Sequence, residues 1–522
     1  MIVQAGSTKD TAIRRQVLIG TFSNTLAKCL MLGIWFFLTP FILRQLGDTQ
    51  YGLWALVGSV VTYGTLLDFG MGGAVIKYIA EHRVRGNWAR AQALIATVLW
   101  LYCGLGLLAI LASIAIAPVF PLVFRLPPEQ QATAYWLVVV MGLNIGISIP
   151  CAVTSSVLKG LQRYDITSSI STLFLLFSAS ATVCVLLLGG DIVAMVAVNI
   201  PTTLALQIPT IWAIKRVVPE LNIGWRGAKR ELAKQVVTFS TSLFINEIAA
   251  RLQTKTDEIV IGIVLTLSAV TPYAIARKLS ESAQLLTEQF LKVLLPIASS
   301  LHAEDDQARL KSLYLTATRL TLAIYLPIAA VLILFAPSIL TLWVGEKYAV
   351  HGQLVAILTV AGLINVSQWP AAFVLQGMER HRLLGWSALG NGIANLVLSL
   401  MLARPFGLIG IALGTLIPMT IESFGVVQLY AARTIGISLG ETLRQVYGPA
   451  LLPLLPTVLV LVAFRETLAI TSLLTLSGVA GIGVAVYGLT YLALGAGNLE
   501  RDLVRSTFQR FSHLARTYRA RL

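Results

Sequence analysis

Residues 246–292 read NEIAARLQTKTDEIVIGIVLTLSAVTPYAIARKLSESAQLLTEQFLK, and they place charged side chains in the middle of a very apolar chain. Spacings of three or four residues put each set on one stripe of a helix. The first stripe is Glu247, Arg251, Thr254, Lys255 and Glu258, and the second is Arg277, Glu281, Gln284, Glu288 and Lys292. Ionisable groups in a bilayer usually face a bundle interior or a wet cavity, so the stripes predict a polar cleft. Alternatively, both stripes lie near helix ends and form ion pairs or reach the interface.

The composition defines the class of protein around this stretch. Apolar residues make up 56% of the 522-residue chain and charged residues only 12%. Long apolar segments recur, and about 20 helical residues are enough to cross a hydrocarbon core of about 30 Å. An open sheet cannot satisfy its backbone in lipid, and the segments lack the period-two alternation of membrane barrels. The sequence therefore predicts an all-α integral membrane protein.

We expect about 14 transmembrane helices with short connections and no inserted soluble domain. The predicted spans are 17–43, 51–77, 93–118, 133–157, 167–188, 192–214, 236–265, 271–300, 315–343, 353–376, 384–403, 408–431, 447–464 and 471–494. With the N-terminus in the cytoplasm, 27 of the 39 lysines and arginines fall on the cytoplasmic side and 5 on the opposite side. This asymmetry predicts cytoplasmic termini, and it explains the net charge of +15 as an orientation signal that faces anionic lipid rather than nucleic acid.

The chain also repeats itself. An offset of 222 residues aligns Tyr51 with Tyr273, together with the spans and the cytoplasmic loops around them. Two groups of six spans then have the same orientation, which predicts two six-helix lobes related by a parallel repeat, with binding between the lobes and alternating access. The predicted parts are an N-terminal lobe (1–214), a cytoplasmic linker (215–235), a C-terminal lobe (236–431), two extra spans (447–494) and a basic cytoplasmic tail (495–522).

Three motifs resemble one known family. Residues 40–54, PFILRQLGDTQYGLW, resemble the first external turn of polysaccharide-export flippases. Residues 66–70, LLDFG, with Ala80 and Glu81 look like the end of their second helix. Asp257, with Ile261 and Gly262 and then residues 273–276, looks like the matching segment of their second half. The chain thus resembles the O-antigen translocase branch of the multidrug/oligosaccharidyl-lipid/polysaccharide exporter superfamily.

The resemblance implies a function and a setting. It implies transfer of an undecaprenyl-pyrophosphate-linked oligosaccharide between the leaflets of the bacterial cytoplasmic (inner) membrane, for O-antigen, lipopolysaccharide, exopolysaccharide or another surface glycan. The expected partners are this lipid-linked glycan, membrane lipids, and polysaccharide polymerase and chain-length proteins. The polyprenyl tail is expected to stay in lipid and to need no protein cavity.

The substrate's chemistry then selects candidate binding residues. A pyrophosphate needs cations in a poorly solvated space, and arginine offers a fork to phosphate oxygens. In repeat register, Asn24 falls on Asn246 and Lys28 falls one position from Arg251, so we expect Lys28 to face Arg251 across the cleft. Glycan hydroxyls need neutral donors and acceptors, which Tyr63, Gln253 and Tyr273 also offer. The predicted substrate-binding residues are Asn24, Lys28, Arg251, Thr254, Lys255, Arg277, Gln284 and Lys292.

The carboxylates leave two interpretations open. Glu247, Asp257, Glu281 and Glu288 either neutralise the cations of an empty cleft or carry a proton for coupling. Partners spaced by four residues favour simple pairing. For Arg44 and Asp68, near opposite ends of the second span and its entry, the alternatives are gating, loop packing and structural support.

Other function classes fit the sequence less well. A multidrug or cation exporter of the same fold would need an acidic cleft, but seven acids within the spans balance seven cations. A membrane-embedded glycan polymerase would need a larger external loop, and a non-transporting scaffold would give the charged stripes no purpose. The four cysteines and five histidines show no metal or redox spacing, and the chain lacks a phosphate-cradling Gly-rich run. No cofactor, metal or catalytic activity is therefore expected.

Overall fold

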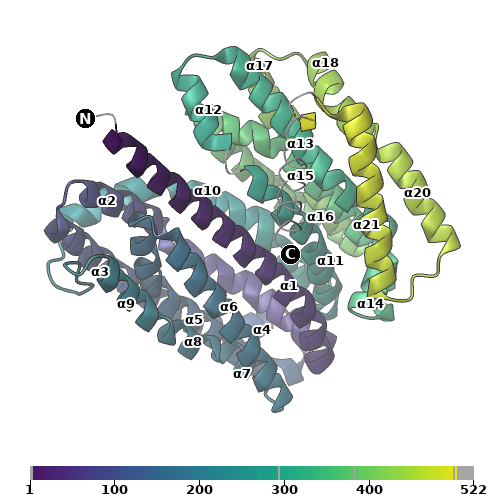
Figure 1. The fold of residues 1–522 in the computed structure, drawn as a ribbon. Helices are drawn as coiled ribbons and strands as arrows, with labels where there is room; N and C mark the ends of the chain where they lie inside the picture. Colours follow the sequence, from purple (N-terminus) through teal and green to yellow (C-terminus); the bar gives the residue numbers. More distant parts are fainter. Residues whose placement is uncertain (1–3, 292–293, 381, 498–499, 502–522) are drawn as a thin grey trace, which may run out of the picture. The chain divides into compact units, whose positions relative to one another are not determined.

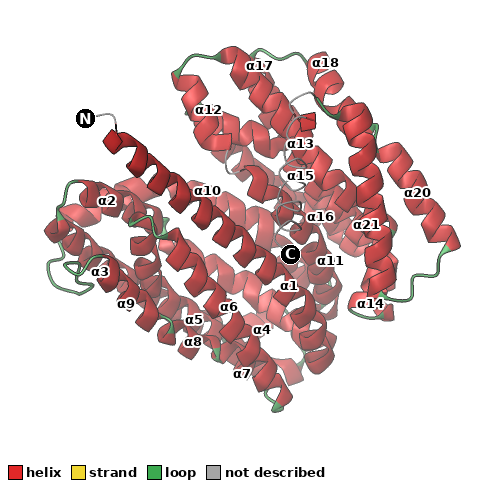
Figure 2. Ribbon diagram, viewed as in Figure 1, coloured by secondary structure: helices red, strands yellow, loops and turns green. Residues whose placement is uncertain are grey.

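The computed structural model describes residues 4–291, 294–380, 382–497 and 500–501, without the side chains of residues 4–27, 242–243, 245–246 and 289–290. In this part of the chain every regular element is a helix and no strand occurs (Figure 2). The predicted all-α class is confirmed.

The helices group into two compact units. The colours of Figure 1 follow the chain from purple at the N-terminus to yellow at the C-terminus. Unit 1 consists of Met1–Ala274 and Ala388–Gly414, and unit 2 consists of Ile275–Ser387 and Thr415–Leu522. Both α11 (Leu267–Leu291) and α16 (Arg382–Thr420) contain residues of both units. These units divide the chain at other places than the predicted lobes, whose boundaries stay a prediction.

Unit 1 is built from the first ten helices of the chain. They are α1 (Gln4–Thr62), α2 (Met71–Val84), α3 (Trp88–Ile116), α4 (Phe120–Val123), α5 (Pro128–Gly160), α6 (Tyr164–Leu187), α7 (Ile192–Ala197), α8 (Asn199–Ala205), α9 (Gln207–Val217) and α10 (Arg230–Val264). Helices α3 and α5 approach each other closely, since a methyl group on Gly106 would lie 2.3 Å from the carbonyl oxygen of Gly146. In lipid, no hydrophobic effect drives helices together, so helix contacts rely on small residues that let two backbones approach closely.

Helix α1 contains the first predicted span and the first part of the second, and it changes direction between them. Gly47 has φ 74° and ψ 174°, a conformation outside the helix that only glycine adopts at low cost. The two arms then lie close together, because Trp35 of the first arm stacks on Trp54 of the second with ring centroids 6.3 Å apart. The turn falls in the motif LRQLGDTQYG, where the sequence predicts the boundary between spans.

The second predicted span is interrupted near its middle. After Thr62 the chain forms a 3-10 helix from Tyr63 to Asp68, and Phe69 and Gly70 then adopt left-handed backbone angles with φ of 49° and 70°. The α-helix resumes at Met71. A left-handed backbone conformation costs a non-glycine residue such as Phe69 about 1–3 kcal/mol, so it persists only where the surrounding structure holds it. Discontinuous membrane helices form binding sites in many transporters.

Unit 2 contains the rest of α11 and the remaining helices. They are α12 (Leu294–Ala303), α13 (Gln307–Leu334), α14 (Ala336–Trp343), α15 (Gly352–Gly377), α17 (Leu429–Ile435), α18 (Leu439–Thr442), α19 (Gly448–Leu451), α20 (Leu454–Thr467) and α21 (Leu473–Thr490). Residues Ile421–Gln428, Leu443–Tyr447 and Tyr491–Gly495 form π-helical turns, which are frequent at functional sites. The core packs α13 against α15, with Tyr314, Leu326 and Val374 buried inside it.

Hydropathy distinguishes the helices that carry the charged stripes from the other membrane helices. Within the described residues, ten helical stretches are long and apolar enough to cross a membrane. Two of them, Lys28–Val84 and Arg382–Ile435, each contain two predicted spans, so the ten stretches account for twelve of the fourteen. The two remaining spans coincide with α10 and with α11–α12, where the charged stripes lie. The chain is a multi-pass membrane protein, and the count of fourteen stays a prediction.

Candidate functional site

The stripe on α10, in unit 1, carries an ion pair that is open to solvent. A guanidinium nitrogen of Arg251 lies 3.5 Å from a carboxylate oxygen of Glu247, with 32% and 52% of the two side chains exposed. Thr254 donates its hydroxyl to the carbonyl of Ala250 at 2.7 Å, and Lys255 on the same stripe is half-buried. The pair is long and exposed, so it adds little stability and leaves the Arg251 guanidinium accessible to an anion.

Tyrosine and phenylalanine side chains fasten the broken second span to α10. The Tyr63 hydroxyl lies 2.8 Å from the hydroxyl of Thr256 and donates to the backbone carbonyl of Arg251 at 3.3 Å. Phe69, at the break, stacks on Phe244 with centroids 4.5 Å apart. The break is therefore held at the level of the α10 stripe. The sequence marks Tyr63 as polar within an apolar span, but only the fold reveals its partner.

Each of two carboxylates accepts a hydrogen bond from a tyrosine. Asp68, the last residue of the 3-10 helix, accepts from Tyr102 of α3. Asp257 of α10 accepts from Tyr273 of α11 at 2.6 Å, and both side chains are buried. A charge-assisted hydrogen bond compensates a buried carboxylate for lost water. These contacts support a structural role for Asp68, while gating and coupling stay predictions.

The stripe on α11, in unit 2, contains a more buried pair. Nε of Arg277 donates to Oε1 of Glu281 at 2.8 Å, and 10% of the arginine side chain is exposed against 47% of the glutamate. A guanidinium this deep in an apolar bundle costs free energy, which a partner four residues away offsets only in part. Arg277 is thus the more desolvated of the two stripe arginines.

A cluster of amides extends this stripe within unit 2. Oε1 of Gln284 accepts from the side-chain amide of Asn365 on α15 at 2.9 Å, and Gln368 donates to Asn365 at 3.2 Å. The Oε1 atom of Gln368 is buried without a hydrogen-bond partner in the described part of the chain. Sequence reasoning missed Asn365 and Gln368, although two amides three residues apart in an apolar span were a visible signal.

Gly362 allows the neighbouring hydroxyls and amides to converge. A methyl group at this position would lie 2.5 Å from the Tyr325 hydroxyl and 3.0 Å from both Nε2 of Gln284 and Oγ of Ser280. Tyr325 and Ser280 in turn donate to backbone carbonyls of α15. The amide cluster is therefore tightly packed and depends on the missing side chain at 362.

The other predicted site residues lie apart or outside the described part. Lys28 is half-buried on α1, Arg44 is exposed shortly before the Gly47 turn, and Glu288 is half-buried on α11. Asn24 lies on α1 with its side chain outside the described part, and Lys292 is outside the described residues altogether. Arg277, Glu281, Gln284 and Glu288 belong to unit 2, whereas the α10 stripe belongs to unit 1. Their convergence on one cleft, and the approach of Lys28 to Arg251, stay predictions.

Metal chemistry finds no support in the described residues. Among them, no group of three or more histidine, cysteine, aspartate or glutamate side chains is placed to hold a metal ion. The four cysteines are free. The site is instead made of cations, carboxylates, tyrosines and amides on membrane helices.

Such an arrangement, with a broken membrane helix and charged stripes in an all-helical fold, is typical of membrane transporters. The same fold occurs in the solved structure of "Lipid II flippase MurJ, inward closed conformation", with a TM-score of 0.70 and 13% identity over 94% of this chain and 100% of that one. Residues 41–352 match the family described as "Polysaccharide biosynthesis protein". The chain belongs to that family, which confirms the resemblance drawn from the motifs.

Curated relatives agree with this assignment. The chain is 22% identical over 434 residues to the "Uncharacterized membrane protein EpsK" of Bacillus subtilis, a match covering 80% of this chain and 83% of the relative. It is 21% identical over 396 residues to the "Probable low-salt glycan biosynthesis flippase Agl15" of Haloferax volcanii, covering 75% of this chain and 78% of the relative.

Proposed function

We propose that the chain is a flippase that moves undecaprenyl-pyrophosphate-linked oligosaccharide repeat units from the cytoplasmic to the periplasmic leaflet of the bacterial inner membrane. It works by alternating access through a cationic cleft between the predicted lobes, with both termini in the cytoplasm. Its product supplies surface polysaccharide assembly, such as that of O-antigen, lipopolysaccharide or exopolysaccharide, alongside a polymerase and chain-length proteins.

The observation that carries the proposal is the desolvated guanidinium of Arg277. It has 10% of its side chain exposed in a membrane helix of a polysaccharide-biosynthesis family member. Its carboxylate partner is far more exposed, so Glu281 would stay in contact with water after an incoming pyrophosphate oxygen replaced it at the guanidinium. Arg251, held to Glu247 by a 3.5 Å contact, would exchange partners in the same way. Arginine suits this role because its planar fork binds phosphate oxygens in pairs.

The neutral groups support recognition of the glycan. Gln284, Asn365 and Gln368 form a chain of amides along the Arg277 stripe, and among the described residues the Gln368 carbonyl oxygen has no hydrogen-bond donor. Amide side chains both donate and accept, as sugar hydroxyls do. In this proposal the cations hold the diphosphate and the amide cluster contacts the first sugar.

The carboxylates are assigned mainly to pairing. Glu247 and Glu281 each lie four residues from an arginine and contact it. Asp68 and Asp257 instead each accept a hydrogen bond from a tyrosine hydroxyl. An exporter of cationic drugs, the competing function for this fold, would need carboxylates that face a ligand without a basic partner on the same stripe.

Deletion of the gene tests the proposal in the native host. Lipid-linked repeat units should accumulate in the cytoplasmic leaflet, and surface glycan should fall. Complementation with the wild-type chain should restore export, whereas a chain carrying both Arg251→Ala and Arg277→Ala should insert normally and fail to restore it. Unchanged surface glycan in the deletion strain would refute the flippase function.

A further inference from the structure

A buried ion pair in unit 2 joins α13 to the chain that follows the last span. Nε and Nη2 of Arg319 lie 2.9 and 2.8 Å from Oε1 of Glu500, and 16% and 3% of the two side chains are exposed. The pairs on the charged stripes differ, because their carboxylates, Glu247 and Glu281, are about half exposed. The Arg319–Glu500 pair therefore belongs to the packing of the fold rather than to a surface open to solvent.

Backbone groups complete the hydrogen bonding of both charges. Nη1 of Arg319 donates to the carbonyl of Gln445 at 3.2 Å, and Oε2 of Glu500 accepts from the amide of Gly497. A methyl group on residue 497 would lie 2.8 Å from Nη2 of Arg319, so this close approach depends on glycine. All three guanidinium nitrogens and both carboxylate oxygens are thus engaged, which is the condition under which a buried pair is tolerated.

Arg319 contacts the chain both where the two extra spans begin and where they end. Gln445 lies in the π-helical turn Leu443–Tyr447, which leads through α19 into α20. Glu500 follows the π-helical turn Tyr491–Gly495, which continues α21. Helices α20 and α21 lie beside α13 (Figure 1) and coincide with the predicted spans outside the repeat. We call the following four residues the Arg319 clasp: Arg319, Gln445, Gly497 and Glu500.

Two further hydrogen-bonded contacts lie near the clasp. The guanidinium of Arg501 donates to the carbonyls of Leu492 and Ala493, at 3.1 Å each, within the last π-helical turn. The hydroxyl of Tyr487 on α21 donates to the carbonyl of Ala450 on α19 at 2.8 Å. The end of the second extra span is therefore bound to the start of the first, and the clasp binds both to α13.

The apolar surface of the extra spans does not fix where they dock. Leu455 and Leu459 on α20 and Leu489 on α21 are 65%, 71% and 69% exposed. In lipid, such side chains gain no hydrophobic free energy from contact with another helix, so close packing and polar contacts decide how helices associate. An ion pair whose donors and acceptors are satisfied in one arrangement specifies that arrangement.

We propose that the Arg319 clasp is a conformational lock that docks the two extra spans onto α13, so that α13, α20 and α21 move as one body. Arg319 and Glu500 act in it as positioning residues. When the lock is broken, α20 and α21 stay in the membrane but take more than one position relative to α13. The lock does not depend on the identity of the substrate, so this inference goes beyond the proposed function.

The test is a distance measurement by double electron–electron resonance on the full-length protein in nanodiscs. Nitroxide labels are attached through Ser312→Cys on α13 and Leu489→Cys on α21, two exposed positions outside the clasp, after the four native cysteines are replaced by serine. The protein with an intact clasp should give one narrow distance distribution. Glu500→Gln keeps the shape of the side chain and removes its charge, so it should broaden the distribution or add a second distance. An unchanged narrow distribution would overturn the proposal.

A charge swap separates the pair from its individual residues. Arg319→Glu alone places two carboxylates together and should broaden the distribution most. Arg319→Glu combined with Glu500→Arg restores opposite charges and should narrow it again. Gly497→Ala leaves both charges in place but puts a methyl group 2.8 Å from Nη2 of Arg319, so it should also broaden the distribution. This variant decides the matter if the Glu500→Gln protein does not fold, and a narrow distribution for it would then overturn the lock.

Glu441→Gln is the matched control. Lys311 on α13 lies 2.7 Å from Glu441, but the two side chains are 33% and 24% exposed. The pair is therefore better hydrated than the clasp, and its loss should leave the distance distribution narrow. Equal broadening by Glu441→Gln and Glu500→Gln would show that any charge at this end of α13 has the same effect, and it would overturn the assignment of the lock to Arg319.

Discussion

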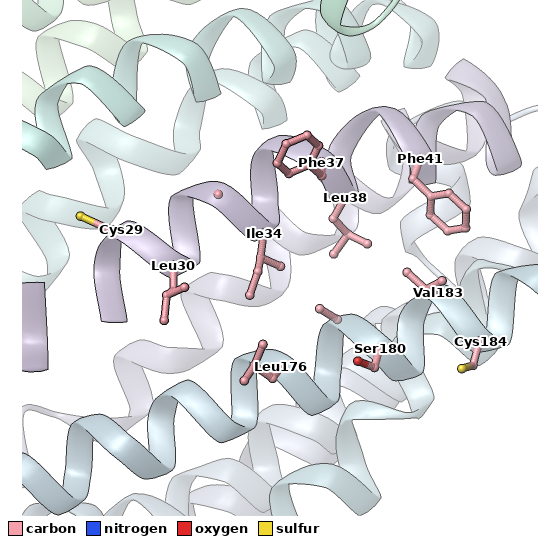
Figure 3. A pocket seen from close by; sticks show the side chains of 12 residues that line it. Cys29, Leu30, Ile34, Phe37, Leu38, Phe41, Leu176, Ser180, Val183 and Cys184 are labelled. Atoms are coloured by element: carbon pink, nitrogen blue, oxygen red, sulfur yellow. The ribbon is translucent and has the colours of Figure 1, made fainter. Parts of the chain in front are cut away.

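In the predicted 222-residue repeat the first arm of α1 corresponds to α10, and the two helices differ in chemistry. At the positions where α10 carries Arg251 and Lys255, α1 carries Cys29 and Gly33. The α10 face holds a partly exposed ion pair, while the α1 face lines an apolar groove of about 890 Å³ that it forms with α6 (Figure 3). Two helices that correspond in the predicted repeat thus present different surfaces, a polar one on α10 and an apolar one on α1.

This difference follows from the cost of charge in a membrane. A cation on a membrane helix is tolerated where a carboxylate or water reaches it, and α10 supplies Glu247 four residues from Arg251. The α1 groove offers no such partner among its described lining residues.

The second arms differ in continuity. The second span is broken at residues 63–70, whereas α11 is a regular helix from Leu267 to Leu291. The break is held by Tyr63 and Phe69 against α10. The helix with the charged stripe is thus regular, whereas the interrupted span carries a single carboxylate, Asp68, which accepts a hydrogen bond from Tyr102.

The largest effect is expected for Arg277→Ala. The variant removes the desolvated guanidinium and with it the proposed phosphate contact, so export should fall by about 100-fold or more. The measurement is transfer of lipid-linked repeat units by complemented cells, with membrane insertion checked by blotting. Arg85→Ala is the control, because Arg85 forms a similar 2.9 Å pair with Glu81 but is 68% exposed. Normal export by the Arg277→Ala protein would make the α11 stripe structural.

A smaller loss is expected for Arg251→Ala. Its pair with Glu247 is longer and more exposed than the Arg277 pair, so export should fall by about tenfold, or about 1.4 kcal/mol. The same transfer measurement applies, and Arg309→Ala serves as a control because Arg309 pairs with Asp306 while 73% exposed. A larger loss of export for Arg251→Ala than for Arg277→Ala would mean that the α10 stripe contributes more to the phosphate contact than the α11 stripe does.

The broken span is tested by Tyr102→Phe. The variant removes the donor to Asp68 and leaves a partly buried carboxylate underhydrated, so the free energy of unfolding should fall by about 1–3 kcal/mol. Thermal unfolding in detergent measures this change. The control is Tyr135→Phe, since the Tyr135 hydroxyl makes no hydrogen bond among the described residues. Equal stability of both variants would mean that the Asp68 contact does not hold the break.

The smallest effect, of opposite sign, is expected for Gly33→Ala. The new methyl group meets no atom within 4 Å and favours helix, so stability should stay equal or rise by up to about 1 kcal/mol. Gly262→Ala is the contrasting variant, because its methyl group would lie 2.7 Å from a Leu56 side-chain carbon and should destabilise the protein. Thermal unfolding of both proteins is the measurement. A clear destabilisation by Gly33→Ala would show that the groove floor is packed.

Much of the fold was predictable because a membrane imposes simple rules on sequence. A helix that crosses a bilayer needs about 20 apolar residues, so the spans are visible as hydropathy, and each predicted span overlaps one or more helices in the described part of the chain. The Gly47 turn was predictable as well, since glycine is the residue that adopts its backbone angles cheaply. The interruption at residues 63–70 was not, because Phe69 carries no local signal for a left-handed conformation.

The candidate site was predictable only in part. The stripes on α10 and α11 were visible as a period of three and four residues, and their pairs Glu247–Arg251 and Arg277–Glu281 lie within one helix. The Tyr102–Asp68 contact and the Asn365–Gln284 contact join residues 34 and 81 positions apart. The spacing of residues along one helix cannot predict a contact between residues so far apart in the chain.

The sequence by itself determined that the chain is an all-helical membrane protein of a polysaccharide-export family, and where its charge lies. Those properties follow from residue types and their spacing along one helix, which the chain carries locally. Tertiary structure decided which polar groups meet, where the second span breaks, and that the face of α1 between Cys29 and Phe41 opens into a groove with α6. These features depend on packing between segments far apart in the chain. An added methyl group would meet open space at Gly33, whereas at Gly362 it would collide with neighbouring side chains.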